Sequence, residues 1–211
     1  MRILVPGATG MVGRHVVEQA LERGHEVTAI ARRPESLGLE HPRLSVEPAD
    51  ITTTGSVEPL LEDIDAVVST VGIGTSTEPT TLYSDGTRNL LRAMKRHGVT
   101  RIVVISSEVA DHWAHQGLLK LWFVLPLLQT FLGATYDDMR RMDVVLWESE
   151  AQWTAIRAPR IRPAAGKGSY RLNVGRPLRR GWMITASDMA AALLDIAERQ
   201  DLGRAHVYVA N

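Results

Sequence analysis

Three glycines near the start of the chain are spaced three residues apart. They stand in the sequence Gly7-Ala8-Thr9-Gly10-Met11-Val12-Gly13, after a short apolar run and before a helical pattern. In that context one glycine permits a tight turn, the next lets backbone N–H groups approach a pyrophosphate, and the third lets the helix pack closely on a sheet. The loop predicts a dinucleotide site; the alternative is an ordinary strand-to-helix turn. The expected cofactor contacts are Gly7, Thr9, Gly10, Met11, Val12 and Gly13.

Two arginines follow the second predicted strand, residues 26–31. An acidic residue at this point would bind the ribose 2′-hydroxyl of NAD. Arg32 and Arg33 instead suit the 2′-phosphate of NADP, because guanidinium groups bind phosphate oxygens through paired hydrogen bonds. We therefore expect NADPH to be preferred over NADH; the alternative is a solvated surface pair.

Further contacts with the dinucleotide are expected where the later strands end. Asp50, followed by Ile51, is placed to accept a hydrogen bond from the adenine amino group, although a turn or cap aspartate has the same signature. The segment Thr70-Val71-Gly72 should pass beneath the nicotinamide ribose. Ser106, at the end of the fifth predicted strand, is grouped with these cofactor-binding residues.

Apolar runs alternate with helical patterns along the chain. The runs predict strands at residues 2–6, 26–31, 44–47, 66–70, 101–106, 153–157 and 206–209. Helices are predicted at residues 11–23, 80–97, 136–149 and 187–199, the last capped by Ser187. Such alternation is typical of an α/β protein with a doubly wound parallel sheet, a Rossmann fold. We expect one NAD(P)-binding domain over residues 1–211, with a small C-terminal substrate lobe and a hydrophobic insert at 111–134, after strand five.

The composition excludes several other kinds of protein. The 211 residues hold 24 basic and 24 acidic side chains, which argues against a nucleic-acid binder that depends on bulk phosphate attraction. The absence of cysteine removes disulfides, thiolate metal sites and thiol nucleophiles. The apolar run at residues 3–5 is too short for a signal peptide, so a cytoplasmic protein is expected.

The glycine loop resembles the G-A-T-G-x-x-G signature of atypical short-chain dehydrogenases with an NAD(P)H-binding, NmrA-like fold. The likeness continues at residues 78–81, 86–90, 97–99, 105–107, 153–159 and 184–190. Within that family the chain is most similar to the biliverdin reductase B and flavin reductase group. The resemblance implies hydride transfer from NADPH to a flat conjugated acceptor lying on the nicotinamide.

At the positions of the family's catalytic residues this sequence differs in part from the family's pattern. Ordinary short-chain dehydrogenases have a Tyr-x-x-x-Lys pair, whereas here Tyr136 is followed by Met139 and then by Arg140, with no lysine at that spacing. Ser107 matches the serine beside the substrate, where it would hydrogen-bond a carbonyl; the alternative is a structural hydroxyl. Arg160 replaces a histidine of that group and would clamp an anion or stabilise an oxyanion, unless it is simply an exposed charge.

The insert is almost wholly apolar over residues 118–132, yet too short and interrupted to cross a membrane. We expect it to cover the nicotinamide as a lid, with Trp113, Trp122 and Phe123 stacking on a flat substrate. The alternatives are a packed helix pair or a dimer surface. No metal site is expected, because His112 and His115 lack further ligands at suitable spacing.

One stretch, residues 157–183, has eight basic residues and no acid. It would draw anionic ligands to the mouth of the site; a solvated face with acids nearby in space is the alternative.

Two functions fit these observations. The first is an NADPH-dependent oxidoreductase for a quinone, flavin or polycyclic aromatic. A variant is a tailoring enzyme of aromatic polyketides that gives net hydroxylation through a reduced quinone and O2. The second is a non-catalytic NADP-binding redox sensor or regulator of the NmrA type. The expected partner is a small planar aromatic substrate, with no nucleic acid and no membrane, and the protein is expected to be a monomer or homodimer.

Overall fold

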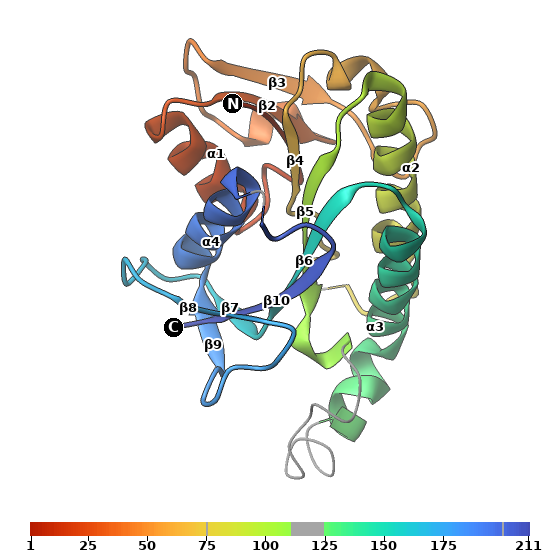
Figure 1. Cartoon of the computed structure of the whole chain (residues 1–211), viewed down its shortest axis with the longest axis vertical. Helices are drawn as coiled ribbons and strands as arrows, with labels where there is room; N and C mark the ends of the chain where they lie inside the picture. The colour runs from red at the N-terminus through yellow and green to blue at the C-terminus, as the bar shows by residue number, and fades with distance from the viewer. Residues whose placement is uncertain (75, 111–124, 200) are drawn as a thin grey trace.

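An eight-stranded sheet forms the centre of the computed structural model, which describes residues 1–74, 76–110, 125–199 and 201–211 (Figure 1). The strand order is β3-β2-β1-β4-β5-β6-β10-β8. All neighbouring strands are parallel except β8, which runs antiparallel to β10. The bounds are β1 Arg2–Pro6, β2 Glu26–Ala31, β3 Leu44–Pro48, β4 Ala66–Ser69, β5 Arg101–Ser107, β6 Gln152–Ala158, β8 Arg171–Val174 and β10 Ala205–Ala210.

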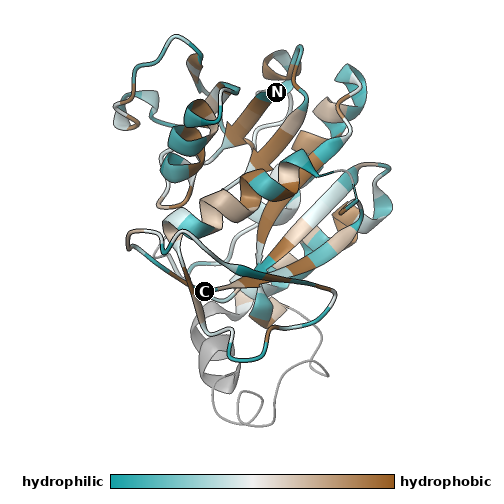
Figure 2. Ribbon diagram, turned by 60° about the vertical axis from the view of Figure 1, so that its left-hand side comes forward, coloured by the Kyte–Doolittle hydropathy of each residue, from teal (hydrophilic) through white to brown (hydrophobic). Residues whose placement is uncertain are grey.

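Helices cover both faces of the sheet. On one face lie α1 (Gly13–Glu22) and α4 (Ala186–Glu198); on the other lie α2 (Leu82–His97) and α3 (Leu125–Glu148) (Figure 1). Each pair encloses its own cluster of buried apolar side chains. Figure 2 shows the result, with largely hydrophobic strands between helices that are hydrophilic on their outer sides. The predicted doubly wound Rossmann architecture is therefore confirmed.

The central strands form where the chain is apolar on both sides of the strand. Every residue of β4, Ala66–Ser69, is buried, as expected for a strand covered by helices on both faces. The predicted stop of α2 is also present: Gly98 adopts φ 70° and its N–H bonds the carbonyl oxygen of Met94.

Three short strands were not predicted. β7 (Arg160–Arg162) pairs with β9 (Met183–Thr185) in a separate two-stranded parallel sheet, and β8 closes the edge of the main sheet. These strands have only three or four residues, and β7 and β8 are largely exposed while β9 buries Ile184 and Thr185, so none has an apolar run long enough to reveal it. Short 3₁₀ turns at Pro34–Ser36, Glu58–Leu61 and Glu108–Ala110 complete the described elements.

Two sequence predictions were wrong. The helix expected from Tyr136 begins at Leu125, because the apolar stretch of the predicted insert continues directly into the helical pattern. The predicted cap of α4, Ser187, lies inside the helix. Thr185 caps it instead, since its hydroxyl accepts the N–H of Asp188 at 3.1 Å.

Candidate dinucleotide and substrate site

A cleft of about 760 Å³ opens along the carboxyl ends of β1 to β4. This edge is where ligands bind in open α/β sheets. Its wall is completed by residues 78–82, which lead into α2. The predicted cofactor residues that line it are Gly7, Thr9, Gly10, Arg32, Asp50, Ile51, Thr70, Val71 and Gly72.

A second cavity, of about 470 Å³, lies between α2 and α3 near the amino ends of β5 and β6. None of the predicted site residues lines it. It lies on the opposite edge of the sheet, so the dinucleotide is expected in the first cleft.

The glycine loop fits a pyrophosphate because no side chain fills it. Gly7 has φ 84°, and a Cβ there would lie 2.8 Å from the backbone of Thr70 and Val71. A Cβ on Gly13 would lie 2.2 Å from the Gly7 carbonyl oxygen, so only glycine allows α1 to start this close to the sheet. No side chain caps the amino end of α1, which leaves its N–H groups available to an anion.

Three predicted loop contacts do not line the cleft. Met11 is exposed, Val12 is buried in the core, and Gly13 is buried at the start of α1. Their backbone N–H groups, rather than their side chains, remain the candidates for phosphate contacts.

The two arginines after β2 are placed differently. Arg32 lines the cleft, whereas Arg33 is exposed and does not. Asp50 faces Arg32 across the cleft and accepts two hydrogen bonds on Oδ1, from Thr52 N at 2.9 Å and Thr52 Oγ1 at 2.7 Å. These bonds, with a further contribution from the Arg32 charge, lower the pKa of Asp50 below its ordinary value. Asp50 thus holds a turn, and its expected contact with adenine remains a prediction.

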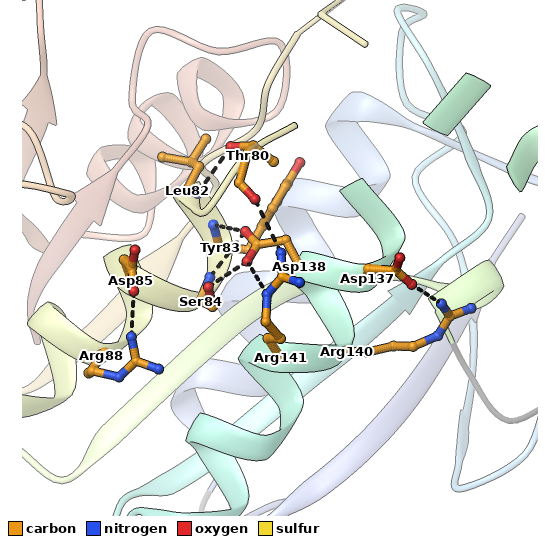
Figure 3. A network of polar contacts seen from close by, with 10 residues as sticks. All are labelled: Thr80, Leu82, Tyr83, Ser84, Asp85, Arg88, Asp137, Asp138, Arg140 and Arg141. Carbon is orange, nitrogen blue, oxygen red and sulfur yellow. Dashed lines mark hydrogen bonds and ion pairs between the residues drawn. The ribbon is translucent and has the colours of Figure 1, made fainter. Parts of the chain in front are cut away.

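A buried carboxylate on α3 caps α2, and sequence reasoning missed it (Figure 3). Asp138 is fully buried and accepts the N–H groups of Tyr83 at 2.8 Å and Ser84 at 3.3 Å, as well as the Ser84 hydroxyl. Arg141 pairs with the same carboxylate at 3.3 Å and reaches the Thr80 carbonyl oxygen at 3.4 Å. Because Thr80 and Leu82 line the cleft, this cluster fixes one cofactor wall to α3.

The sequence contained a signal for this cap. The residue before α2, Thr81, offers no capping side chain, and Asp138 interrupts the apolar pattern of another helix. A helix start without a cap and an isolated acid elsewhere are each weak signals, and only the fold brings them together.

Two tyrosines, Tyr83 and Tyr136, belong to the buried cluster on the α2–α3 side of the sheet, and Tyr83 lies beside residues 72–73 of the cleft. The Tyr83 hydroxyl accepts the N–H of Ile73 and lies 3.8 Å from where a Cβ on Gly72 would be. Burial raises the pKa of both Tyr83 and Tyr136 above the ordinary value for a phenol. Met139 is buried in the core, and Arg140, four residues after Tyr136, pairs with Asp137 at 2.6 Å.

The two serines at the end of β5 differ in role. Ser106 is buried and accepts a hydrogen bond from Arg157 at 2.7 Å, so it lies away from the cleft. The Ser107 hydroxyl is half-buried and accepts the N–H of Val109 at 3.2 Å, which leaves its own proton available to a ligand. Arg160 is exposed on β7. The predicted stacking residues Trp113, Trp122 and Phe123 lie outside the described residues.

Comparison with known proteins now identifies the family. Residues 7–200 match the sequence profile of a family described as NAD(P)H-binding. The chain belongs to this NAD(P)H-binding family. The expected likeness to atypical short-chain dehydrogenases is confirmed, and the grouping with biliverdin reductase B stays a prediction.

Curated relatives match part of this NAD(P)H-binding protein. A 3-beta-hydroxysteroid dehydrogenase of Mycolicibacterium neoaurum is 37% identical over 118 residues, covering 51% of this chain and 32% of the relative. The photosystem II assembly factor Ycf39 of Synechocystis is 32% identical over 110 residues, covering 50% and 33%. The matched region thus spans about a third of the length of these relatives.

Solved structures share the whole fold. A wide-type short-chain dehydrogenase/reductase from Veillonella parvula, in complex with NADP, has a TM-score of 0.83 at 16% identity and covers 100% of this chain and 94% of its own. At that identity the likeness establishes the fold alone. Among the described residues there is no group of three or more potential metal ligands, and none of the described helices is long and apolar enough to cross a membrane.

Proposed function

We propose that this NAD(P)H-binding protein is an NADPH-dependent reductase of a flat conjugated acceptor: a quinone, a flavin or a polycyclic aromatic. The observation that carries the proposal is the protonation of the Tyr136 phenol. Burial raises the pKa of this phenol, and the position four residues later holds no lysine but Arg140, which pairs with Asp137 at 2.6 Å. Such a phenol gives up its proton less readily than an ordinary tyrosine and is a poor general acid.

The nature of the acceptor follows from that chemistry. Reduction of an isolated carbonyl needs an acid that delivers a proton to a localised alkoxide. A quinone or flavin spreads the new charge over its conjugated system, so hydrogen bonds to its carbonyl oxygens suffice. Ser107 and Tyr136 are the proposed donors of those bonds, and Arg160 is proposed to attract an acceptor that carries negative charge.

Different parts of the cleft hold different parts of the cofactor. Bound NADPH supplies the hydride, and the proton that completes reduction comes from water. The glycine loop at residues 7–13 holds the pyrophosphate, Arg32 the 2′-phosphate, and residues 70–72 support the nicotinamide ribose. Ser106 supports β5 from behind. The hydrophobic insert, residues 111–134, is proposed from its sequence to cover the acceptor, so its deletion should abolish turnover and spare NADPH binding.

Turnover assays test the proposal directly. NADPH oxidation is followed with menadione, FMN and a hydroxylated anthraquinone, each with and without oxygen. Oxidation that depends on an acceptor supports the reductase. Tight NADP binding without turnover of any acceptor would replace it with the redox sensor, which the missing lysine also fits. A hydroxylated product that forms only with oxygen would support the tailoring variant.

Cofactor preference has its own test. Replacing Arg32→Ser should weaken NADPH by about 10- to 100-fold, the range for one charged hydrogen-bonding group, and leave NADH unchanged. Arg33→Ser is the matched control, because Arg33 does not line the cleft. A wild-type protein that prefers NADH would refute the assignment.

A further inference from the structure

The zero net charge of this chain hides two large opposite charges. Residues 160–183, which we call the basic lobe, hold seven basic side chains and no acidic one. The remaining chain has 17 basic against 24 acidic residues, a formal charge of −7. The eighth base of the sequence pattern, Arg157, is buried against Asp143 at 2.7 Å and takes no part in this surface.

No acid neutralises the basic lobe within the part of the chain that the structure describes. Its seven cations are all exposed, and no described ion pair includes any of them. The described ion pairs with a cation beyond residue 156 belong to Arg157, Arg199 and His206. The acid that follows the lobe, Asp188, is buried and accepts the N–H groups of Lys167 at 2.8 Å and Gly168 at 3.1 Å. The described residues therefore do not support the alternative, in which nearby acids balance the charge of this face.

The basic lobe is held in a fixed shape. The Arg171 guanidinium donates to the carbonyl oxygens of Arg179 at 2.9 Å, Arg180 at 3.3 Å and Asn211 at 3.2 Å. Arg180 adopts a left-handed backbone with φ 58°, which arginine rarely does. The N–H of Asn211 in turn bonds Met183 O at 3.0 Å. The loop that carries Arg179 and Arg180 is thereby tied to β9, beside the C-terminus in Figure 1.

Apolar side chains are exposed among these charges. Trp182 is 58% exposed, Val174 49% and Met183 38%. Met183 is the β-sheet partner of Arg160, and its sulfur lies 3.6 Å from the Arg162 guanidinium. Ile161 and Ile184 pack into the core, so Arg160, Arg162 and Met183 face the other way.

We propose that the basic lobe docks on the surface of an anionic phospholipid bilayer. Arginines attract acidic headgroups, and tryptophan prefers the boundary between headgroups and acyl chains. A nucleic acid would satisfy the charges but leaves the three exposed apolar side chains unexplained; an acidic protein is the competing partner that the test below separates from a bilayer. The acidic remainder of the molecule keeps the contact restricted to this one face. The docking does not depend on the proposed reductase activity.

Vesicle sedimentation tests the docking. The full-length protein is mixed with vesicles of phosphatidylglycerol and phosphatidylcholine, or of phosphatidylcholine alone, at low and high salt. We expect binding to the anionic vesicles that is lost at about 0.5 M salt, where the screening length falls to roughly 4 Å. The double variant Arg176→Gln/Arg179→Gln should weaken that binding by about 30-fold, since each base near an anionic surface contributes about fivefold. Trp182→Ala should weaken it as well.

Control variants separate the lobe from net charge. Arg92→Gln/Arg96→Gln removes the same charge from the exposed side of α2 and should bind vesicles like the wild type. All variants should keep wild-type NADPH binding and circular dichroism. Equal binding to both kinds of vesicle, no binding to either, or an equal loss in the α2 control would overturn the proposal. Tighter binding to a DNA duplex or to polyglutamate than to anionic vesicles would replace the bilayer with that partner.

Discussion

Replacing Asp138→Ala should lower the free energy of unfolding by about 3 kcal/mol. The carboxylate is fully buried and accepts the first free N–H groups of α2, from Tyr83 and Ser84, which are themselves buried. Two buried donors left without an acceptor cost about 1–3 kcal/mol each, and about 1.5 kcal/mol for each gives this figure. The ion pair with Arg141 adds little, because that side chain is half exposed and water replaces its partner.

Thermal unfolding followed by circular dichroism measures this loss. For a chain of this size 1 kcal/mol shifts Tm by roughly 2–4 °C, so Asp138→Ala should unfold about 6–12 °C below the wild type. Asp138→Asn keeps an acceptor of the same shape and should lose about a third as much. NADPH affinity should fall with stability in the alanine variant, because Thr80 and Leu82 lie in the cleft wall that the cap holds.

The neighbouring acid provides the control. Asp137 is exposed and pairs only with Arg140 among the described residues, so Asp137→Ala should shift Tm by less than about 2 °C. A shift for Asp138→Ala no larger than this would show that the start of α2 finds other acceptors. Asparagine and alanine variants of equal stability would show that the carboxylate acts only by filling space.

Three further predictions follow from the described contacts. Gly13→Ala should abolish NADPH binding in a fluorescence titration, because the new Cβ would lie 2.2 Å from the Gly7 carbonyl oxygen; retained binding would show that the loop yields. Arg157→Met should cost about 3 kcal/mol in urea unfolding, because it leaves buried Asp143 with only the His206 ring at 3.6 Å, and a loss below about 1 kcal/mol would contradict this. Burial alone would raise the pKa of Asp188, but its hydrogen bonds lower that pKa below the ordinary value of 3.8. The ionised carboxylate therefore stabilises the fold above pH 3.8, and this stabilisation is lost as the pH falls through the pKa that Asp188 has in the folded protein. Asp188→Asn should therefore flatten unfolding free energy against pH in that acid range, and an unchanged slope would refute this.

The sequence predicted the central sheet and the nucleotide loop well. Strands β1, β2, β4, β5, β6 and β10 are largely buried apolar runs, and β3 is only partly buried. A glycine loop between a strand and a helix has few other uses. Arg32 was also placed correctly from its position after β2, because the carboxyl ends of parallel strands meet at one edge.

The remainder depended on contacts between distant segments. Asp138 is one acid among many until the fold brings it 2.8 Å from the N–H of Tyr83, 55 residues away. The strands β7 and β9 are held by each other rather than by their own apolarity. The basic lobe was visible as a charge pattern, but only the structure shows that no described acid neutralises it.

The position of β10 has a consequence for how the chain is made. β10 is the last strand in the sequence, yet it lies between β6 and β8, which are synthesised earlier. Until it arrives, β6 has a free edge beside the side chains of Trp153 and Ile156, which are fully buried in the finished protein. An open apolar edge of this kind pairs readily with other chains. Nascent or C-terminally truncated chains should therefore aggregate through β6 and depend on chaperones until the last strand closes the sheet.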